Sequence, residues 1–392
     1  MDSFFRPTWV EISLDALRAN ISAFRRILPA EMKMMAVVKA DAYGHGLTEI
    51  AAEAADAGMD YIGVAFFDEA LKLRRSGFTV PLLVLGYTPP EAVALALQHD
   101  ITITIYSDDL LPALREVGKT AAAAGKSVKV HIKLDTGMGR IGQFEQSAAI
   151  AYIAQTLALP GVKVEGLFTH YACADERDKT YTYEQHRKFA GIVDHFAAQG
   201  VRFPLLHAGN SATGIELPAL SWNMLRLGIS MYGFYPSVTV DHNKIHLEPV
   251  MSFKTKPVMI KTLPPGSGVS YGATYVTKTS EKIATLPVGY GDGYTRLLTG
   301  RAEVLIRGRR APLVGRICMD QCMVDISHLG DVSLQDEVVL FGKQGDNVIS
   351  ADELAQKLGT INYEILCMVS ARVPRVYVRN GQVVKTVNHL LE

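Results

Sequence analysis

A single lysine stands where a short apolar run gives way to a polar, glycine-rich segment. Lys39 follows Ala36-Val37-Val38 and precedes Ala40-Asp41-Ala42-Tyr43-Gly44-His45-Gly46. Burial lowers the pKa of an amine, so a lysine at the end of a buried strand can serve as a nucleophile or base near neutral pH. A lone lysine in this position is more often a surface residue. The phenol of Tyr43 and its neighbouring glycines favour a cofactor-binding loop instead.

Two arginines follow, or lie within, later apolar runs. Arg140 ends the glycine-rich segment Asp135–Arg140, and its planar guanidinium suits a carboxylate that accepts two hydrogen bonds. An ordinary surface ion pair explains Arg140 equally well. Arg226 lies inside the apolar run Met224–Leu227 and should be buried with a partner. That partner is either a cofactor ring nitrogen or an acidic side chain.

A third group of residues could hold a phosphate. Asn210-Ser211-Ala212-Thr213 resembles the start of a short helix, where backbone N–H groups and a hydroxyl bind anions. The N–H groups of Gly228 and Ile229 could add further donors. A simple Asn or Ser helix cap is the alternative explanation.

Eight short apolar runs, alternating with helix-like segments, predict the elements that position these residues. Continuous apolar runs indicate strands buried on both faces, as in a parallel sheet covered by helices. We therefore expect a (β/α)8 TIM-type barrel with its active site at the carboxyl ends of the strands. A doubly wound open sheet is the alternative, and the count of eight favours the barrel. The expected strands are Ala36–Val38, Tyr61–Ala65, Leu82–Leu85, Ile101–Ile105, Val128–Leu134, Val164–Thr169, Leu205–His207 and Met224–Leu227.

The pattern changes after about residue 246. Short strand-like runs with Gly and Pro between them predict a second, mostly β-strand domain. We expect a barrel over residues 1–246 and a β-rich domain over 247–392. One helix, Ala351–Leu358, should begin at a capping box of Ser350 and Glu353. The strand-like runs are Pro257–Leu263, Lys282–Val288, Glu303–Ile306, Val324–Ile326 and Glu337–Phe341.

Composition excludes several classes of protein. Forty basic and forty acidic residues leave no net charge to attract nucleic acid or an anionic membrane. No stretch approaches the roughly 18 apolar residues that span a bilayer, and the first ten residues lack a secretory signal. The four cysteines have no zinc-site spacing and are interpreted as reduced, mostly buried thiols. We expect a cytoplasmic protein without a metal site.

The sequence around Lys39 resembles the cofactor-lysine signature of the alanine racemases, and the resemblance covers nearly the whole chain. Eleven residues, Ala36–Gly46, carry it most specifically, and further motifs follow in the family's order. These motifs are Trp9–Ile12, Lys133–Arg140, Phe168–His170, Asn210-Ser211, Arg226–Ile229, Val269–Tyr275, Val288–Gly293, Gly315–Asp320, Ile361–Glu364 and Arg372–Arg375.

The resemblance implies a role for each matching residue. Lys39 would hold pyridoxal 5'-phosphate as a Schiff base and, with Tyr271, would be one of two catalytic bases. Arg226 would face the pyridine nitrogen with His170 behind it. Arg140 would bind the substrate carboxylate, and Lys133 matches a position that is carbamylated in some members. Met319 would lie beside the substrate. The phosphate and its surroundings would be bound by Tyr43, Asn210, Ser211, Gly228, Ile229 and Tyr363.

The implied activity is interconversion of L- and D-alanine, which supplies D-alanine for peptidoglycan. Racemisation needs proton removal on one face of the substrate and return on the other, so a lysine and a phenol on opposite faces suit it. Family members are usually homodimers with composite active sites, in which Tyr271 and Met319 enter the partner's site. The alternatives are a broad-range, serine or lysine racemase. A pyridoxal-phosphate decarboxylase and a non-catalytic carrier fit less well, because the second domain brings Tyr271.

Overall fold

The computed structural model describes residues 4–391, which form two compact units. One unit contains Leu17–Ala42 and Leu47–Glu248. The other contains the described residues up to Ala16, the short segment Tyr43–Gly46, and the chain from Pro249 onward.

The first unit is a parallel eight-stranded sheet rolled toward a barrel. From β2 to β8 each strand pairs with the next one along the chain, and the last strand, β9, pairs with the first, β2. The hydrogen-bonded order therefore runs from β8 back to β2 and on to β9. Single hydrogen bonds join β8 to β9, among them Asn223 N–H to the Leu206 oxygen at 3.2 Å. This order confirms the barrel and contradicts the open, doubly wound sheet. The strands are β2 Lys33–Val37, β3 Tyr61–Val64, β4 Leu82–Val84, β5 Thr102–Ile105, β6 Val128–Lys133, β7 Val162–Phe168, β8 Leu205–His207 and β9 Met224–Leu227.

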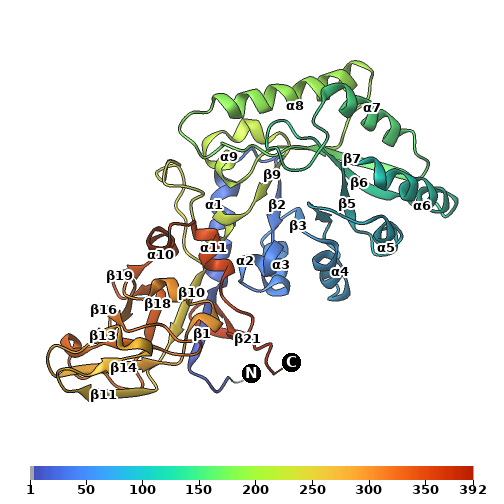
Figure 1. The fold of residues 1–392 in the computed structure, drawn as a ribbon. Helices are drawn as coiled ribbons and strands as arrows, with labels where there is room; N and C mark the ends of the chain where they lie inside the picture. The colour runs from blue at the N-terminus through green and yellow to red at the C-terminus, as the bar shows by residue number, and fades with distance from the viewer. Residues whose placement is uncertain (1–3, 392) are drawn as a thin grey trace. The chain divides into compact units, whose positions relative to one another are not determined.

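Helices follow the strands and lie outside them (Figure 1). The strands are buried along almost their whole length, which explains their unbroken apolar sequences, and each covering helix buries one face. The helices are α1 Leu14–Ile27, α3 Leu47–Asp56, α4 Phe67–Arg75, α5 Val93–Gln98, α6 Leu111–Ala123, α7 Gln146–Leu157, α8 Thr180–Ala198 and α9 Ser211–Glu216. The short segment α2, Lys39–Tyr43, follows β2.

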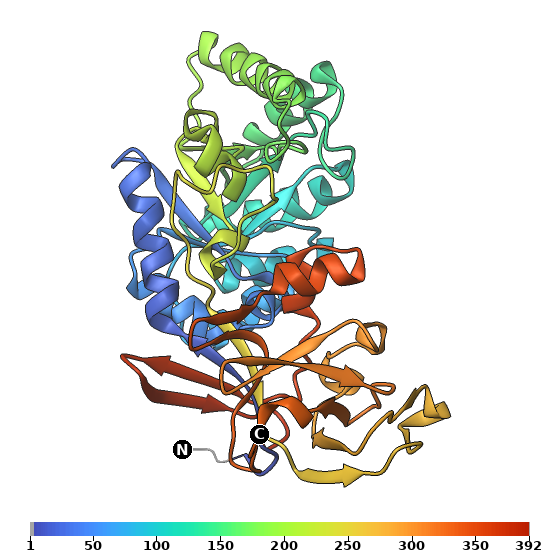
Figure 2. The same cartoon turned by 90° about the vertical axis from the view of Figure 1, so that its left-hand side faces the viewer.

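The second unit is mostly β-strand, as expected (Figure 2). Its long sheet is largely antiparallel and includes one N-terminal strand, β1 Thr8–Ser13, which pairs with β10 and β20. The strands are β10 Met251–Thr255, β11 Met259–Leu263, β12 Gly268–Val269, β13 Tyr275–Val276, β14 Glu281–Leu286, β15 Glu303–Ile306, β16 Arg309–Val314, β17 Cys322–Asp325, β18 Val338–Gln344, β19 Asn347–Ile349, β20 Arg375–Arg379 and β21 Gln382–Val387. The division expected at residue 246 stays a prediction for the domain boundary.

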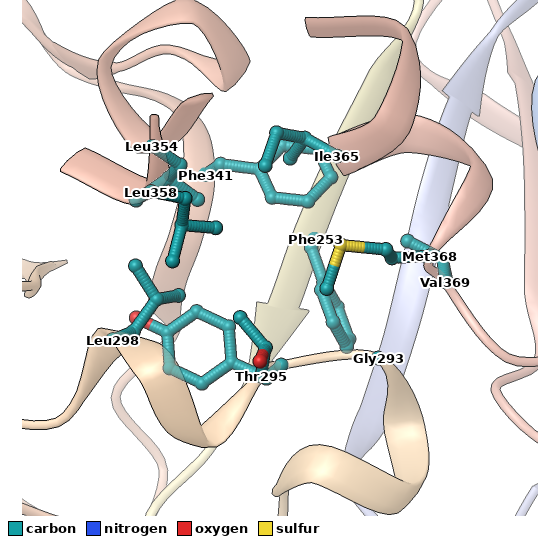
Figure 3. Close-up of a pocket in the computed structure, with 11 residues that line it drawn as sticks. Phe253, Gly293, Thr295, Leu298, Phe341, Leu354, Leu358, Ile365, Met368 and Val369 are labelled. Carbon is teal, nitrogen blue, oxygen red and sulfur yellow. The ribbon is translucent and has the colours of Figure 1, made fainter. Parts of the chain in front are cut away.

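Two short helices, α10 Ala351–Leu358 and α11 Asn362–Cys367, complete this unit. Figure 3 shows where they meet the sheet, with Leu354 and Ile365 from the helices and Phe253 and Phe341 from the strands lining a small apolar cavity. The helix at 351–358 is confirmed, and the Ser350 hydroxyl accepts the Glu353 N–H at 3.0 Å.

Two details differ from expectation. The Glu353 carboxylate does not complete a capping box but binds Arg310 through two contacts of 2.8 Å, because a charged partner outcompetes a backbone N–H. Of the four free cysteines, Cys322 is buried and Cys367 is exposed, so the thiols are not mostly buried. No helix among the described residues has the length and apolar character needed to cross a membrane.

Candidate active site

Lys39 lies at the carboxyl end of β2, where it begins a single left-handed helical turn. Ala40, Asp41, Ala42 and Tyr43 have φ angles of 53–55°, and the Ala42 N–H donates to the Val38 oxygen at 2.8 Å. This conformation costs residues other than glycine about 1–2 kcal/mol each. Such strain persists only where the surroundings impose it, and it is concentrated at functional sites.

Side chains of the barrel unit hold the first part of this turn. The Ala40 N–H donates to Glu69 Oε1 at 2.7 Å, and the Leu47 N–H donates to Asp41 Oδ1 at 2.8 Å. The peptide that follows Lys39 is therefore fixed by a carboxylate from helix α4.

The second part of the segment belongs to the β-rich unit. Arg375, which is 2% exposed, donates from Nε and Nη2 to the Gly44 oxygen at 3.2 and 3.1 Å. The Tyr377 hydroxyl donates to the His45 oxygen at 2.9 Å. Gly44 has φ +82°, and an added Cβ would stand 2.4 Å from the Leu366 oxygen, so a larger residue would displace this backbone.

Arg226 is buried within β9, as its apolar strand predicted. Its Nη1 donates to His207 Nδ1 at 2.9 Å, and its Nη2 donates to His170 Nδ1 at 2.9 Å. Nη2 also donates to the backbone oxygens of Thr169 and Ala208, both at 3.0 Å. A guanidinium only donates, so both imidazoles accept at Nδ1 and carry their proton on Nε2. The partners of Arg226 in the described chain are thus imidazoles and carbonyls.

The histidine chain continues inward. His207 Nε2 lies 2.8 Å from His131 Nδ1, so His131 accepts there in turn. Burial lowers the pKa of His131 to about 3, with the Arg226 charge as a second cause. Burial and the same charge also hold the pKa values of His170 and His207 well below their usual range. All three rings are therefore neutral at physiological pH.

The Nε–H of Arg226 remains for a ligand. Its four hydrogen bonds come from Nη1 and Nη2, and Nε–H has no acceptor among residues 4–391. A neutral aromatic nitrogen, which accepts one hydrogen bond, is the kind of partner that a single N–H donor in this position fits.

Three of the expected phosphate residues, Asn210, Ser211 and Gly228, lie close together in the barrel unit. The Ser211 hydroxyl oxygen accepts from the N–H groups of Gly228 at 3.1 Å and Ser230 at 3.4 Å. Asn210 caps α9 by accepting the Thr213 N–H at 3.1 Å. Because the Ser211 oxygen accepts in both of these bonds, its own hydrogen can point to an anion. The first N–H groups of a helix have no partner within it, and α9 presents its own beside this hydroxyl.

Lys133 is a buried amine among cations. It is 3% exposed, and its Nζ donates to the Leu134 oxygen at 3.1 Å. Burial, with the charges of Arg226 and Arg140, holds its pKa well below the usual range. These surroundings therefore favour the neutral, nucleophilic form of the amine.

The segment that carries Arg140 is folded around a carboxylate. Asp135 accepts from the N–H groups of Gly137 and Gly139, both at 3.0 Å, and of Arg140 at 2.9 Å. Partial burial disfavours the charged form of Asp135, but these three donors outweigh burial and lower its pKa. The Arg140 side chain is exposed and accessible to a substrate.

Tyr271 and Met319 share one hollow in the β-rich unit, together with Ser270, Cys318 and Asp320. Tyr271 is 69% exposed and Met319 is 53% exposed. The Tyr271 loop is fixed because Ser270, at φ 63°, donates through its hydroxyl to the Arg316 oxygen at 2.6 Å. Both side chains are thus presented outward from a fixed backbone.

Tyr43 and Tyr363 are neighbours in the same unit, with ring centroids 6.1 Å apart. Burial, with smaller effects from Tyr363 and Cys367, raises the pKa of Tyr43, so its hydroxyl is a donor rather than a base. No group of three His, Cys, Asp or Glu side chains in the described chain could hold a metal ion.

Three contributors to the site were not predicted from the sequence. His131 and His207 end up behind Arg226, and Glu69 binds the peptide after Lys39. A histidine inside an apolar strand was the available signal for His131, and a histidine that ends one was the signal for His207. Glu69 gave no such signal, because an acidic residue in the first turn of a helix is common.

Comparison with known proteins gives a consistent result over the full chain. Residues 12–236 match the family described as alanine racemase, N-terminal domain, and residues 250–377 match the alanine racemase C-terminal domain. An alanine racemase of Clostridium perfringens is 43% identical over 390 residues, covering 100% of both chains. One from Desulfovibrio desulfuricans is 47% identical over 96% of this chain and all of its own.

Solved structures agree. An alanine racemase of Clostridium difficile superposes with a TM-score of 0.93 at 42% identity, covering 99% of this chain and 100% of its own. An alanine racemase of Bacillus anthracis with bound L-Ala-P gives 0.91 at 41% identity, covering 100% of both. A histidine racemase of Leuconostoc mesenteroides gives 0.87 at 29% identity, covering 96% of this chain and 100% of its own.

Proposed function

Because the chain belongs to the alanine racemase family, it is an isomerase that interconverts L- and D-alanine, and we propose that Lys39 and Tyr271 are its two bases. The observation that carries the assignment of the cofactor site is Arg226. A buried guanidinium with two neutral histidines behind it and its Nε–H left unused is arranged for an aromatic nitrogen acceptor.

The residues fit pyridoxal phosphate held by Lys39. When bound, this cofactor withdraws electrons from the substrate and so weakens its Cα–H bond. Ser211, with the N–H groups of Gly228 and Ile229, would bind the phosphate within the barrel unit. Tyr43 and Tyr363 would add their hydroxyls, and Asn210 would hold the helix start in place.

Arg226 would keep the pyridine nitrogen unprotonated. Its guanidinium donates hydrogen bonds and accepts none, so it can pair with the pyridine nitrogen only when that nitrogen carries no proton. His170 and His207 are neutral and bound through Nδ1, which keeps Arg226 oriented. An unprotonated ring withdraws electrons less strongly, and we propose that this favours racemisation over side reactions such as transamination.

Lys39 Nζ and the Tyr271 hydroxyl would exchange the substrate proton from opposite faces. Each enantiomer presents its Cα–H to one of them, which removes the proton while the other returns one. A phenol has an ordinary pKa near 10, so Tyr271 needs a positive charge nearby to act as a base. Arg140, which we propose binds the substrate carboxylate, is the candidate for that charge.

Lys133 is positioned to become a carbamate. A neutral amine adds to carbon dioxide, forming an N–C bond and releasing one proton, and the product is an anion. The cationic surroundings that lower the pKa of Lys133 would stabilise that anion, and it would orient Arg140. The test is ¹³C NMR of the protein in buffer enriched with ¹³C-bicarbonate. A carbamate signal that is absent in Lys133→Met would support the proposed modification.

We further propose a cytoplasmic homodimer with composite sites. The exposure of Tyr271 and Met319 in one chain suits side chains that the other chain covers. The partner's Tyr271 would then act with Lys39, and Met319 would lie beside the substrate. Mixing Lys39→Ala with Tyr271→Phe protein should restore about a quarter to a half of the activity per dimer if sites are composite, and none if each chain is self-sufficient.

Substrate choice is tested by initial rates of the purified, yellow holoenzyme. L-alanine should be racemised faster than L-serine, L-lysine and L-histidine. Histidine is included because the similar Leuconostoc structure is a histidine racemase. A higher rate on any of the three would overturn the preference for alanine.

A further inference from the structure

We propose that Glu69 is a positioning residue that sets the direction of Lys39. This inference rests on the proposed role of Lys39 as a base. The structural observation behind it is independent of that role, because it concerns the backbone of the barrel unit.

The Glu69 carboxylate joins three backbone N–H groups from two strand ends. Its Oε1 accepts from Ala40 at 2.7 Å, and its Oε2 accepts from Ala65 at 2.7 Å and Phe66 at 3.1 Å. Phe66 is the N-cap residue of α4, so the Oε2 contacts are those of a helix cap. The Oε1 contact is not part of that cap, since it reaches the turn after β2.

The Ala40 N–H belongs to the peptide that leaves Lys39, and its plane helps to fix the direction of the Lys39 side chain. Ala40 is exposed and has φ 53°. If Glu69 could not accept, water could satisfy this N–H in other conformations, and the strained turn could relax toward an ordinary one. A displacement of about 1 Å at a reacting group can cost about 100-fold in rate.

The carboxylate is well matched to this task. Both of its oxygens are used as acceptors, so the isosteric amide of glutamine can serve only one side and turns an NH₂ donor toward the other. Asp68 is the matched control, because it precedes Glu69 in the same helical turn and carries the same charge. In the part of the chain that the structure describes, no hydrogen bond from Ala40 to Asp68 is found.

The first test is hydrogen exchange at the Ala40 amide, with the purified protein. We expect Glu69→Gln to raise its exchange rate by about 10–100-fold, as for the loss of a charge-assisted hydrogen bond, while Asp68→Asn leaves it unchanged. Equal exchange in the wild type and Glu69→Gln would overturn the proposal. This readout does not depend on activity, so a wild type without racemase activity would refute the proposed function and leave the Glu69 contact testable.

The second test separates positioning from general damage. With α-deuterated alanine, the two enantiomers present the label to opposite faces, and Lys39 serves one of them. Glu69→Gln should lower kcat/KM by about 10–100-fold, equally for both enantiomers because their equilibrium constant is 1. It should raise the primary isotope effect only for the enantiomer whose label faces Lys39. Asp68→Asn should change neither quantity. An isotope effect that rises for both enantiomers or for neither would contradict a positioning role. So would a Glu69→Asp variant that has the melting temperature of Glu69→Gln and recovers no activity.

Discussion

Arg226 Nη1 donates to His207 Nδ1 at 2.9 Å, and this contact fixes where the buried imidazoles carry their protons. His207 then donates from Nε2 to His131 Nδ1, at 2.8 Å. The protonation state of these histidines is thereby set by one guanidinium, whose Nε–H we propose donates to the cofactor.

The buried histidines predict an acid-sensitive fold. The pKa of His131 is about 3 in the folded protein and about 6.5 in the unfolded chain. Between these values the unfolded chain binds a proton that the folded protein does not, so the stability present above about pH 6.5 is lost as the pH falls toward 3. His131→Gln should reduce the slope of unfolding free energy by about 1.4 kcal/mol per pH unit. Urea titrations from pH 7 to pH 4 would measure it, and parallel curves for both proteins would refute the account.

Arg226→Glu should change the selectivity of the reaction. A carboxyl group can share a proton with the pyridine nitrogen, whereas a guanidinium cannot, so electron withdrawal would increase. We expect racemisation to fall by about 100-fold or more and transamination, measured as pyruvate formed per racemisation event, to rise. Arg226→Lys is the matched control, because an ammonium also has donors only. An unchanged ratio in Arg226→Glu would show that the ring nitrogen is not controlled by this residue.

Gly44→Ala should destabilise the protein more than Gly58→Ala. The two glycines have similar φ angles, +82° and +84°, so both substitutions cost about 1–2 kcal/mol in backbone strain. The added Cβ meets the Leu366 oxygen at 2.4 Å at Gly44 and nothing within 4 Å at Gly58. We expect about 1–3 kcal/mol more loss at Gly44, measured by urea unfolding. Equal losses of unfolding free energy would contradict this, because they would mean that the added Cβ at Gly44 is accommodated without strain.

The sequence alone predicts the elements with continuous apolar patterns best. Leu205–His207, Met224–Leu227 and Ala351–Leu358 have the expected bounds. The strand at Thr8–Ser13 was not predicted, because its alternating burial is set by partners more than 200 residues away, such as Phe253 opposite Val10.

The left-handed turn could not be predicted either. Ala40, Asp41 and Ala42 favour ordinary helical angles, and only contacts such as Ala40 with Glu69 impose the other hand. Lys39, Arg226 and Ser211 were found from their positions at strand and helix ends. The tautomers of His170 and His207 follow from the direction of a single guanidinium, which no local pattern encodes.

The two-base assignment is tested most directly by separating proton exchange from racemisation. Tyr271→Phe removes one base and leaves Lys39 in place. In D₂O this variant should incorporate deuterium into one enantiomer of alanine with retention, while racemisation falls by about 100-fold or more. Loss of exchange and racemisation in equal proportion for both enantiomers, or racemisation at the wild-type rate, would contradict the assignment of Lys39 and Tyr271 to opposite faces.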